Sequence, residues 1–359
     1  MKRIYFLLVL ALAVSCNRTK PEGRPVINLV REVIADAGSP EHMLVADYDA
    51  ADPVKSIYVA GAPERCKPIL MSLKECDSYD NADGRAVGDG LPDFAGEVIC
   101  TILDFANTPY SKYLGREEDL NEVTVRTVLA AMDTLCYINE FDRNGMATKP
   151  QAKVVVLASP YASAYGQFDV DSLFRTLGCN LPVVYPLRSM LDEVLAGRNT
   201  GAVVGVVAEK DSLTAGSYAS YVAENGAAGS DCVVLSPDPE ATDPLLAFLD
   251  SCLVAGKTRP FDAILVDDTT VDAEAMRLTL KRITTATNEE SLSYGKLIAP
   301  GCRILDVLST VNDECYRLLR KENLFRLDIA YPRSIEYKTV ATSDGSVVLT
   351  QYDDGDPLK

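Results

Sequence analysis

Side chains that could bind a solute or carry out acid–base chemistry follow the strand-like runs in the second half of the sequence. They stand in four loops, after Ala158, Ala208, Leu235 and Val266. The candidates are Ser159, Tyr161, Ser163, Glu209, Ser236, Asp267 and Asp268. Hydroxyls and carboxylates at these places could hydrogen-bond a polar ligand, and two carboxyl groups in different surroundings could act as acid and base. The same residue types cap helices at strand-to-helix junctions, so each candidate also has a purely structural alternative.

A second candidate region is the acidic, glycine-rich segment 77–97, called the acidic loop below. An EF-hand with its glycine at Gly84 would need an acid at position 79 and a glutamate at position 90, but Tyr79 and Gly90 stand there. Another calcium geometry stays open, and Asp93 could instead cap a helix. Because long loops in compact domains are often functional, we predict that Asp89 and Asp93 contribute to a ligand cleft.

Several classes of function are disfavoured by what the sequence lacks. One histidine, His42, cannot build a multi-histidine metal site and lies far from any candidate nucleophile. The sequence contains no Gly-x-Ser-x-Gly nucleophile elbow, no P-loop and no strand-linked Gly-x-Gly-x-x-Gly, so we predict no metal and no nucleotide cofactor. The formal net charge of −17 disfavours nucleic acid and electrostatic docking on anionic lipids.

The ten cysteines do not form an evident disulfide framework. Cys66 and Cys76 share one expected helix, about 15 Å apart at 1.5 Å per residue, and Cys302 and Cys315 share another. Disulfides need Cα atoms within about 7 Å of each other, so neither pair can close. Most of the others lie in apolar runs and are expected to act as small buried hydrophobes. The sequence leaves the disulfide state of these cysteines open.

The strand-end candidates belong to a region, 151–290, in which apolar runs alternate with helical patterns. The expected strands are 153–158, 182–185, 202–208, 232–235 and 263–266, and the expected helices are 170–177, 187–196, 213–224, 243–255 and 272–286. Runs that are apolar on both faces are typical of a buried parallel sheet, which right-handed crossovers make doubly wound. Ligands bind beyond the carboxyl ends of such strands, where the candidate loops lie.

The remaining sequence predicts a first lobe and a returning C-terminal segment. The first lobe, 26–150, is expected to hold a helix at 25–37, strands at 43–48 and 56–60, and helices at 61–75, from 93 to about 105 and at 120–136. Residues 291–359 are expected to pack back on it with a helix at 301–323 and a hairpin of strands 334–342 and 346–352. The prediction is an α/β fold of two Rossmann-like lobes with mainly parallel, doubly wound sheets and a C-terminal β-hairpin.

The first sixteen residues resemble a bacterial lipoprotein signal. Lys2 and Arg3 precede eleven apolar residues, 4–14, which are followed by Ser15 and Cys16. The resemblance implies removal of residues 1–15, lipidation of Cys16 and a flexible tether at 16–25, and Asn17 implies an outer-membrane lipoprotein that faces the periplasm. The alternative is an ordinary secretory signal with an incidental cysteine. A membrane-spanning helix is disfavoured, because it needs about 20 apolar residues.

Two further resemblances bear on function. The runs 203–208, 217–221, 231–234 and 260–266 resemble the second lobe of type I periplasmic binding proteins, which close two α/β lobes on a small polar ligand. The runs 154–166, 182–184 and 204–218 are similar to the middle of the aspartate/glutamate racemases, whose acid and base are two cysteines, one in each lobe. Those thiols would fall near Ser159 and Ser236, where no cysteine stands. This second resemblance therefore implies a related fold whose chemistry is lost or altered.

These observations favour a lipid-anchored protein of the cell envelope that binds a small polar solute between two lobes. The alternative is an envelope enzyme, a hydrolase or isomerase of racemase-like fold, that uses carboxylates or Ser159. A scaffold without a small ligand is a third possibility, and the sequence does not indicate the oligomeric state.

Overall fold

The protein is built around two mainly parallel β-sheets. The computed structural model describes residues 24–141, 144–209, 212, 216–238, 241–285 and 289–352, and at 289–291 it describes the backbone alone. From edge to edge, the larger sheet contains β4 (Met146–Thr148), β3 (Leu135–Tyr137), β12 (Val347–Gln351), β11 (Arg333–Ala341), β2 (Val98–Leu103), β1 (Ser56–Gly61), β5 (Ala152–Leu157) and β6 (Val183–Val184). The smaller sheet contains β10 (Ile298–Asp306), β9 (Phe261–Asp267), β7 (Val203–Ala208) and β8 (Asp231–Leu235). The predicted α/β fold and its C-terminal hairpin, β11–β12, are confirmed.

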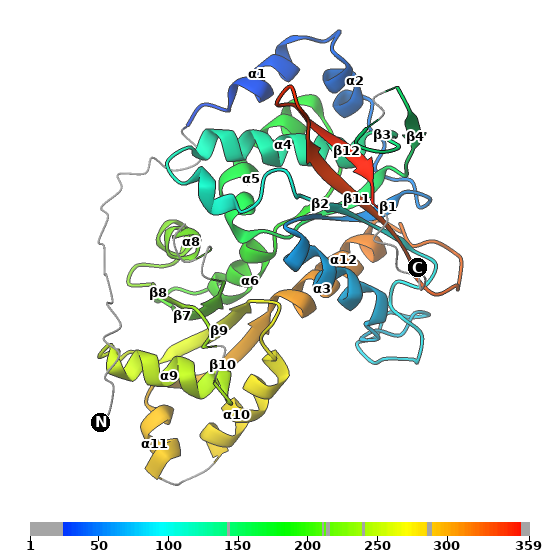
Figure 1. Cartoon of the computed structure of the whole chain (residues 1–359). Helices are drawn as coiled ribbons and strands as arrows, with labels where there is room; N and C mark the ends of the chain where they lie inside the picture. Colours follow the sequence, from blue (N-terminus) through cyan, green and yellow to red (C-terminus); the bar gives the residue numbers. More distant parts are fainter. Residues whose placement is uncertain are drawn as a thin grey trace.

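The helices form three layers around these sheets (Figure 1). The outer face of the larger sheet carries α1 (Asn28–Ala35), α2 (Pro40–Ala46), α4 (Glu117–Met132) and α5 (Pro160–Leu177). Between the sheets lie α3 (Pro63–Glu75), α6 (Pro186–Leu195) and α12 (Val307–Lys321), with α8 (Ser217–Asn225) packed against α6. The outer face of the smaller sheet carries α9 (Pro244–Val254) and α10 (Ala273–Thr285), and α11 (Glu289–Gly295) packs against α10. A short 3-10 helix, η2 (Tyr110–Tyr113), precedes α4.

A single middle core joins the two lobes. Alternate residues of a strand point to opposite faces of its sheet, so each sheet divides its apolar side chains between two cores. Val59 of β1 and Val206 of β7 belong to the middle core, which also holds the inner faces of α3, α6 and α12. Tyr58 faces the outer core under α4, and Val207 faces the core under α9. The lobes therefore share buried apolar surface and are not joined only through linkers.

The lobe built on the smaller sheet is one continuous insertion into the other lobe. The chain leaves the larger sheet after β6, passes through α6 to β7, and returns through α12 to β11. Residues 151–185 are predicted to belong to the second lobe, but β5 pairs with β1 and β6 pairs with β5. The boundary between the lobes therefore lies after β6, because strand pairing places β5 and β6 in the larger sheet.

Three expected elements differ from those of the structure. Residues 43–46, predicted as part of a strand, belong to α2, which begins after Ser39, whose Oγ accepts a hydrogen bond from the amide of His42 at 3.2 Å. The predicted helix around 94–105 contains strand β2, which is buried on both faces. The predicted helix 301–323 begins with the end of β10, and α12 starts only after Asp306, which caps it through the amide of Ser309 at 2.9 Å.

Candidate functional site

One buried arginine, Arg65 near the start of α3, connects the carboxyl ends of strands from both sheets. Its side chain is 2% exposed. Nε donates to the carbonyl oxygen of Ala158 at 2.8 Å, and Nη1 donates to Glu209 Oε1 at 2.9 Å and to the carbonyl oxygen of Asp267 at 2.8 Å. Nη2 pairs with the carboxylate of Asp267. The ends of β5, β7 and β9 therefore meet at this guanidinium, and we call this cluster the strand-end junction.

The carboxylate of Asp267 is enclosed on all sides. Its side chain is 0% exposed, and it accepts from the Arg65 guanidinium and from the Tyr218 hydroxyl. Burial, followed by the charge of Asp267, raises the pKa of Tyr218 well above its usual value, so the phenol remains a donor. A buried ion pair with its partners satisfied in this way holds structure together and does not offer a free base. The junction joins the lobes where the sequence predicted an open cleft.

Glu209 is the carboxylate of the junction that keeps contact with solvent. Its side chain is 29% exposed, whereas those of Arg65 and Asp267 are nearly or fully buried. Burial raises the pKa of the Glu209 carboxyl, although the charge of Arg65 acts in the opposite direction. A carboxyl group with a raised pKa and access to solvent can exchange a proton with a bound molecule.

Ser159, Tyr161 and Ser163 begin α5 and support its first turn. Ser159 Oγ accepts a hydrogen bond from the amide of Ala162 at 3.3 Å, which is the capping role named as the structural alternative. The Ser163 hydroxyl has two carbonyl oxygens within hydrogen-bonding distance, that of Leu157 at 2.9 Å and that of Ser159 at 2.6 Å, and its single proton is shared between them. Tyr161 is buried. Ser159 lies beside the junction, since it follows Ala158, but its hydroxyl already has a structural partner.

The remaining strand-end candidates lie outside the network of Arg65. Asp268 is buried, and its Oδ1 accepts from the amide of Thr270 at 2.9 Å and from its hydroxyl at 2.6 Å, which closes a local turn. Ser236 is exposed and follows β8, an edge strand of the smaller sheet. Arg65 therefore links the strand of Ser159 to Asp267. Ser236, near which the racemase resemblance placed the second thiol, follows a strand that contributes no group to this network.

A further strand-end carboxylate, Asp104, is not among the predicted site residues. It directly follows β2, is 0% exposed and accepts from the hydroxyls of Tyr110 at 2.9 Å and Thr339 at 2.5 Å. Asn107 donates to it through its backbone amide at 3.2 Å and its side chain at 2.9 Å. The sequence signal for Asp104 was a carboxylate directly after the apolar run 98–103. Because this run is predicted as part of a helix, Asp104 is not recognised as a strand-end residue.

The acidic loop turns its carboxylates toward its own backbone. Asp93 accepts from the amides of Ser78 at 3.0 Å and Tyr79 at 2.9 Å and does not cap a helix. Asp89 accepts from the amide of Asn81 at 3.0 Å, so both predicted ligand residues hold the loop in shape. Within the ranges that the structure describes, no group of three or more His, Cys, Asp or Glu side chains is placed to hold a metal ion.

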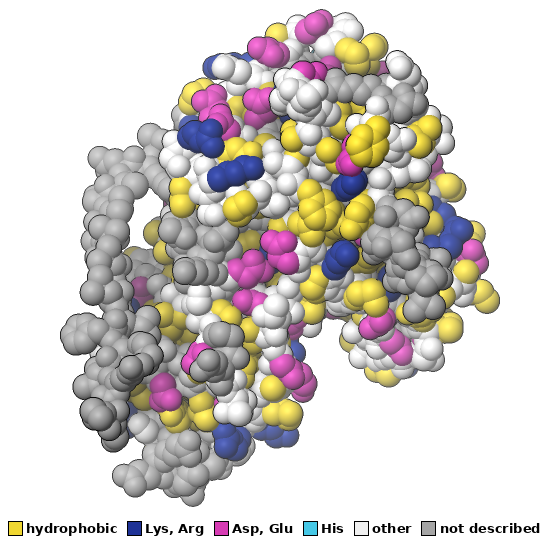
Figure 2. Space-filling view, viewed as in Figure 1, with side chains coloured by type: hydrophobic (Ala, Val, Ile, Leu, Met, Phe, Trp, Pro, Cys, Tyr) yellow, Lys and Arg dark blue, Asp and Glu magenta, His cyan; other side chains and the backbone are white. Residues whose placement is uncertain are grey.

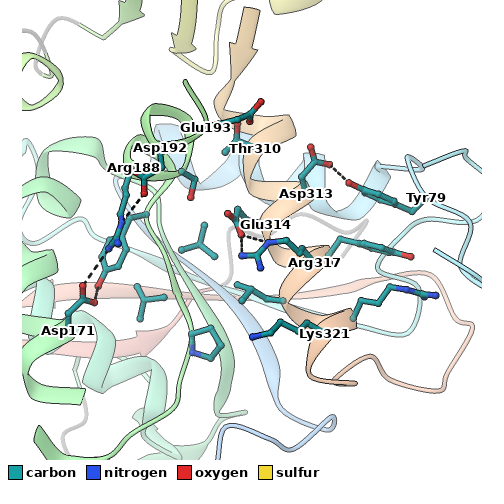
Figure 3. Close-up of a pocket in the computed structure, with 18 residues that line it drawn as sticks. Tyr79, Asp171, Arg188, Asp192, Glu193, Thr310, Asp313, Glu314, Arg317 and Lys321 are labelled. Carbon is teal, nitrogen blue, oxygen red and sulfur yellow. Dashed lines mark hydrogen bonds and ion pairs between the residues drawn. The ribbon is translucent and has the colours of Figure 1, made fainter. Parts of the chain in front are cut away.

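A cavity of about 870 Å³ lies between α6 and α12, and we call it the helix-pair pocket (Figure 3). Its lining includes Val184 of β6 and Leu318 of α12 as apolar members. Tyr79 of the acidic loop also lines it and stacks on Tyr316, with ring centroids 4.1 Å apart and planes at 7°. The acidic loop thus contributes an aromatic ring to this pocket, although its predicted carboxylates do not line it.

Charges of both signs face each other across the helix-pair pocket (Figure 3). The basic lining residues are Arg188, Arg317, Arg320 and Lys321, and the acidic ones are Asp171, Asp192, Glu193, Asp313 and Glu314. On one wall Arg188 lies 3.2 Å from Asp192 and 3.7 Å from Asp171. On the other wall Asp313 accepts from the Tyr79 hydroxyl at 2.9 Å, and burial raises the pKa of its carboxyl. Figure 2 shows acidic and basic side chains interspersed over one face of the molecule, with no large area of one sign.

The residues that resemble an export signal lie outside the part of the chain that the structure describes. Cys16 and the predicted tether up to residue 23 precede the first described residue, so the lipoprotein assignment stays a prediction. Among the helices of the described ranges, none combines the length and the apolar character needed to cross a bilayer.

Comparison with solved structures finds similarity to glutamate racemases. The enzyme from Francisella tularensis, solved with D-glutamate, has a TM-score of 0.47 and 14% sequence identity, over 82% of this chain and 91% of the racemase. The RacE1 isoform from Bacillus anthracis has a TM-score of 0.46 and 13% sequence identity, over 80% of this chain and 90% of the racemase. The Aquifex pyrophilus enzyme has a TM-score of 0.41 and 14% sequence identity, over 80% of this chain and 91% of the racemase. No protein-family model matches the sequence, and the search of curated proteins finds no match. The resemblance to type I periplasmic binding proteins stays a prediction.

Proposed function

We propose that this protein binds a small polar solute in the helix-pair pocket and is held at the cell envelope through a lipid on Cys16. The observation that carries the proposal is the pocket itself. Its volume of about 870 Å³ lies within the usual range for small-molecule sites, roughly 300–1,000 Å³. Stacked aromatic rings, an apolar floor and charged walls are the elements from which such sites are made.

The chemistry of the walls favours a solute that carries both a positive and a negative charge. Arg188 could pair with a carboxylate, and Asp313 could pair with an amine. Arg317 and Glu314 already form an ion pair with each other, so a solute would have to share or replace that pair. The stacked rings of Tyr79 and Tyr316 offer an aromatic surface beside them. Amino acids and short peptides have this combination of groups, whereas neutral sugars do not.

The closed strand-end junction supports this location over the interlobe cleft predicted from the sequence. Arg65 occupies the place where a ligand would meet the strand ends, and removing it would leave Asp267 buried without its counter-ion. A ligand in the helix-pair pocket needs no such rearrangement. The candidate residues Ser159, Ser163 and Asp267 then have structural roles.

The experiment is a calorimetric titration of the full chain with amino acids, dipeptides, sugars and nucleosides. A zwitterionic solute is expected to bind, and Arg188→Gln is expected to weaken it about tenfold, since a charge-assisted contact is lost. Arg198→Gln is the matched control, because Arg198 pairs with Asp262 at 2.8 Å away from the pocket lining. Absence of any bound member of the panel, or equal affinity in both variants, would overturn the proposal.

A second candidate, the envelope enzyme, is favoured by one observation. Glu209 combines a raised carboxyl pKa with partial exposure, and it shares Arg65 with the strand that leads to Ser159. In this reading Glu209 transfers the proton in a hydrolysis or isomerisation. Incubation of amino acids in D₂O with NMR detection of Cα exchange, and a panel of ester and amide substrates, test it. Turnover that is abolished by Glu209→Gln supports the enzyme, and turnover that is unchanged excludes this role.

A further inference from the structure

A second cavity lies at the opposite ends of the strands of the larger sheet. Its volume is about 650 Å³, and it opens at the amino ends of β1, β2, β5 and β11. Its lining residues are Asp52, Val54, Lys55, Val98, Thr134, Lys149, Pro150, Gln151, Arg326, Arg333, Ser334 and Ile335. None of them lines the helix-pair pocket. We call this cavity the amino-end pocket.

Positive charge dominates the amino-end pocket. Lys55, Lys149, Arg326 and Arg333 line it, and Asp52 is the acidic residue among the lining residues. The excess of three positive charges, four minus one, stands out on a chain of formal net charge −17. Because like charges repel in a partly desolvated space, four cations that share a cavity favour an anion between them.

The nearby carboxylates are already engaged. Glu97 lies 2.7 Å from Lys153 in a fully buried pair and 3.7 Å from the Nε of Arg326. Asp52 accepts from the amide of Val54 at 2.9 Å. The Arg326 guanidinium also donates to the carbonyl oxygens of Val54 and Lys55. The Arg326 guanidinium therefore retains capacity for a further acceptor, whereas the Lys55 ammonium already donates to the carbonyl oxygen of Asp49 and lies over the ring of Tyr48.

Lys149 gives the strongest indication of a missing anion. The residue is 5% exposed, and its ammonium donates to the carbonyl oxygen of Asp133 at 2.5 Å and lies 3.4 Å from the Tyr58 hydroxyl. It also lies 5.1 Å from the centroid of the Tyr58 ring. No carboxylate within the described ranges forms an ion pair with it. Burial lowers the pKa of Lys149 to about 8, and the charge of the nearby Asp133 acts in the opposite direction without restoring the usual value.

We infer that the amino-end pocket binds a small organic anion through a phosphate or carboxylate group held by Lys149, Arg326 and Arg333. Arginine forks match the oxygens of either group, and the lysine supplies a point charge. The cavity is larger than one such group requires, which leaves room for the body of a small metabolite. This site is independent of the solute pocket proposed above, since the two have no residue in common.

The test is calorimetric titration of the full chain with inorganic phosphate and, separately, with citrate, at constant ionic strength. Saturable binding is expected for at least one anion, and Arg333→Gln is expected to weaken it about tenfold. Arg333 is exposed, so its replacement leaves folding intact, and Lys149→Met provides a second, buried probe. Lys281→Gln, an exposed position on α10, is the matched control and should retain the affinity within about twofold.

The titrations distinguish a phosphorylated ligand from a carboxylate, and they distinguish anion binding at the amino-end pocket from solute binding at the helix-pair pocket. Preference for phosphate identifies a phosphorylated ligand, and preference for citrate identifies a carboxylate. Anion binding that survives Arg188→Gln, at the helix-pair pocket, and fails in Arg333→Gln assigns the anion to the amino-end pocket. No binding of either anion, or binding that neither Arg333→Gln nor Lys149→Met weakens, overturns the inference.

Discussion

Replacing Arg65 with methionine tests the strand-end junction most directly. The guanidinium is the counter-ion of a fully buried carboxylate, and it also donates to Glu209 and to two backbone carbonyl groups. Removing one partner of a buried ion pair typically costs about 3–5 kcal/mol, because the other charge remains buried. The Tyr218 hydroxyl stays as a donor to Asp267 and offsets only part of this cost. We expect a loss of about 3–5 kcal/mol in the free energy of unfolding.

Urea unfolding followed by circular dichroism measures this loss through linear extrapolation. The matched control is Arg303→Met, because Arg303 pairs with Glu193 at 2.7 Å with both side chains about half exposed, 55% and 47%. Exposed pairs of this kind contribute about 0–1 kcal/mol. Combining Arg65→Met with Asp267→Asn should cost less than the sum of the single changes, because the stranded charge is gone. A loss below about 1 kcal/mol for Arg65→Met would refute the role of Arg65 as a buried connection between lobes.

Three further predictions follow from the same contacts. Glu97→Gln should lower the free energy of unfolding by about 3 kcal/mol, because it leaves the fully buried Lys153 without its counter-ion. Urea unfolding measures this loss, and a loss below about 1 kcal/mol would contradict the prediction. Ser159→Ala should cost about 1 kcal/mol through loss of the α5 cap, whereas Ser159→Thr should retain most of the stability in the same assay. Burial raises the pKa of nine thiols, for example Cys252 to about 11 and Cys302 to about 12, so the folded chain holds protons that the unfolded chain loses above about pH 8.5. Stability should therefore be lost as the pH rises from about 8.5 toward 11, by up to about 1.4 kcal/mol per pH unit for each thiol. Burial lowers the pKa of three lysines, Lys55, Lys149 and Lys153, in Lys149 to about 8, so these three groups oppose the loss. Unfolding curves at pH 7.5, 9 and 10 that coincide would contradict it.

The alternating second half of the chain was predictable because its strands carry their own signal. The run 202–208 is apolar at every position, and the structure contains β7 at 203–208. The run 98–103 is equally buried, but Phe94, Val98 and Ile102 also have the spacing of one face of a helix. Because this strand is buried on both faces, its sequence lacks the alternation of apolar and polar residues that marks a half-exposed strand. The start of α2 had a readable signal, Ser39 followed by Pro40, which outweighs the strand-like residues after it.

The candidate site was less predictable than the fold because its parts are distant in sequence. Arg65 and Asp267 are separated by 202 positions, and no local pattern marks an arginine that will be buried by a second sheet. The rule that ligands bind at the carboxyl ends of strands selected Ser159, Glu209 and Asp267, which do lie in or beside one junction. Local pattern does not reveal whether such a junction is open or closed. That outcome depends on the length and charge of a single side chain from α3.

The position of β11 has a consequence for how this molecule is made. This strand lies inside the larger sheet, between β2 and β12, yet it begins only at residue 333, after the complete inserted lobe. While the ribosome is still adding the last residues, β2 has a bare edge whose backbone groups can pair with another chain. Completion of the first lobe must therefore wait for nearly the whole polypeptide, so a nascent chain released before residue 333 is a candidate for aggregation or degradation.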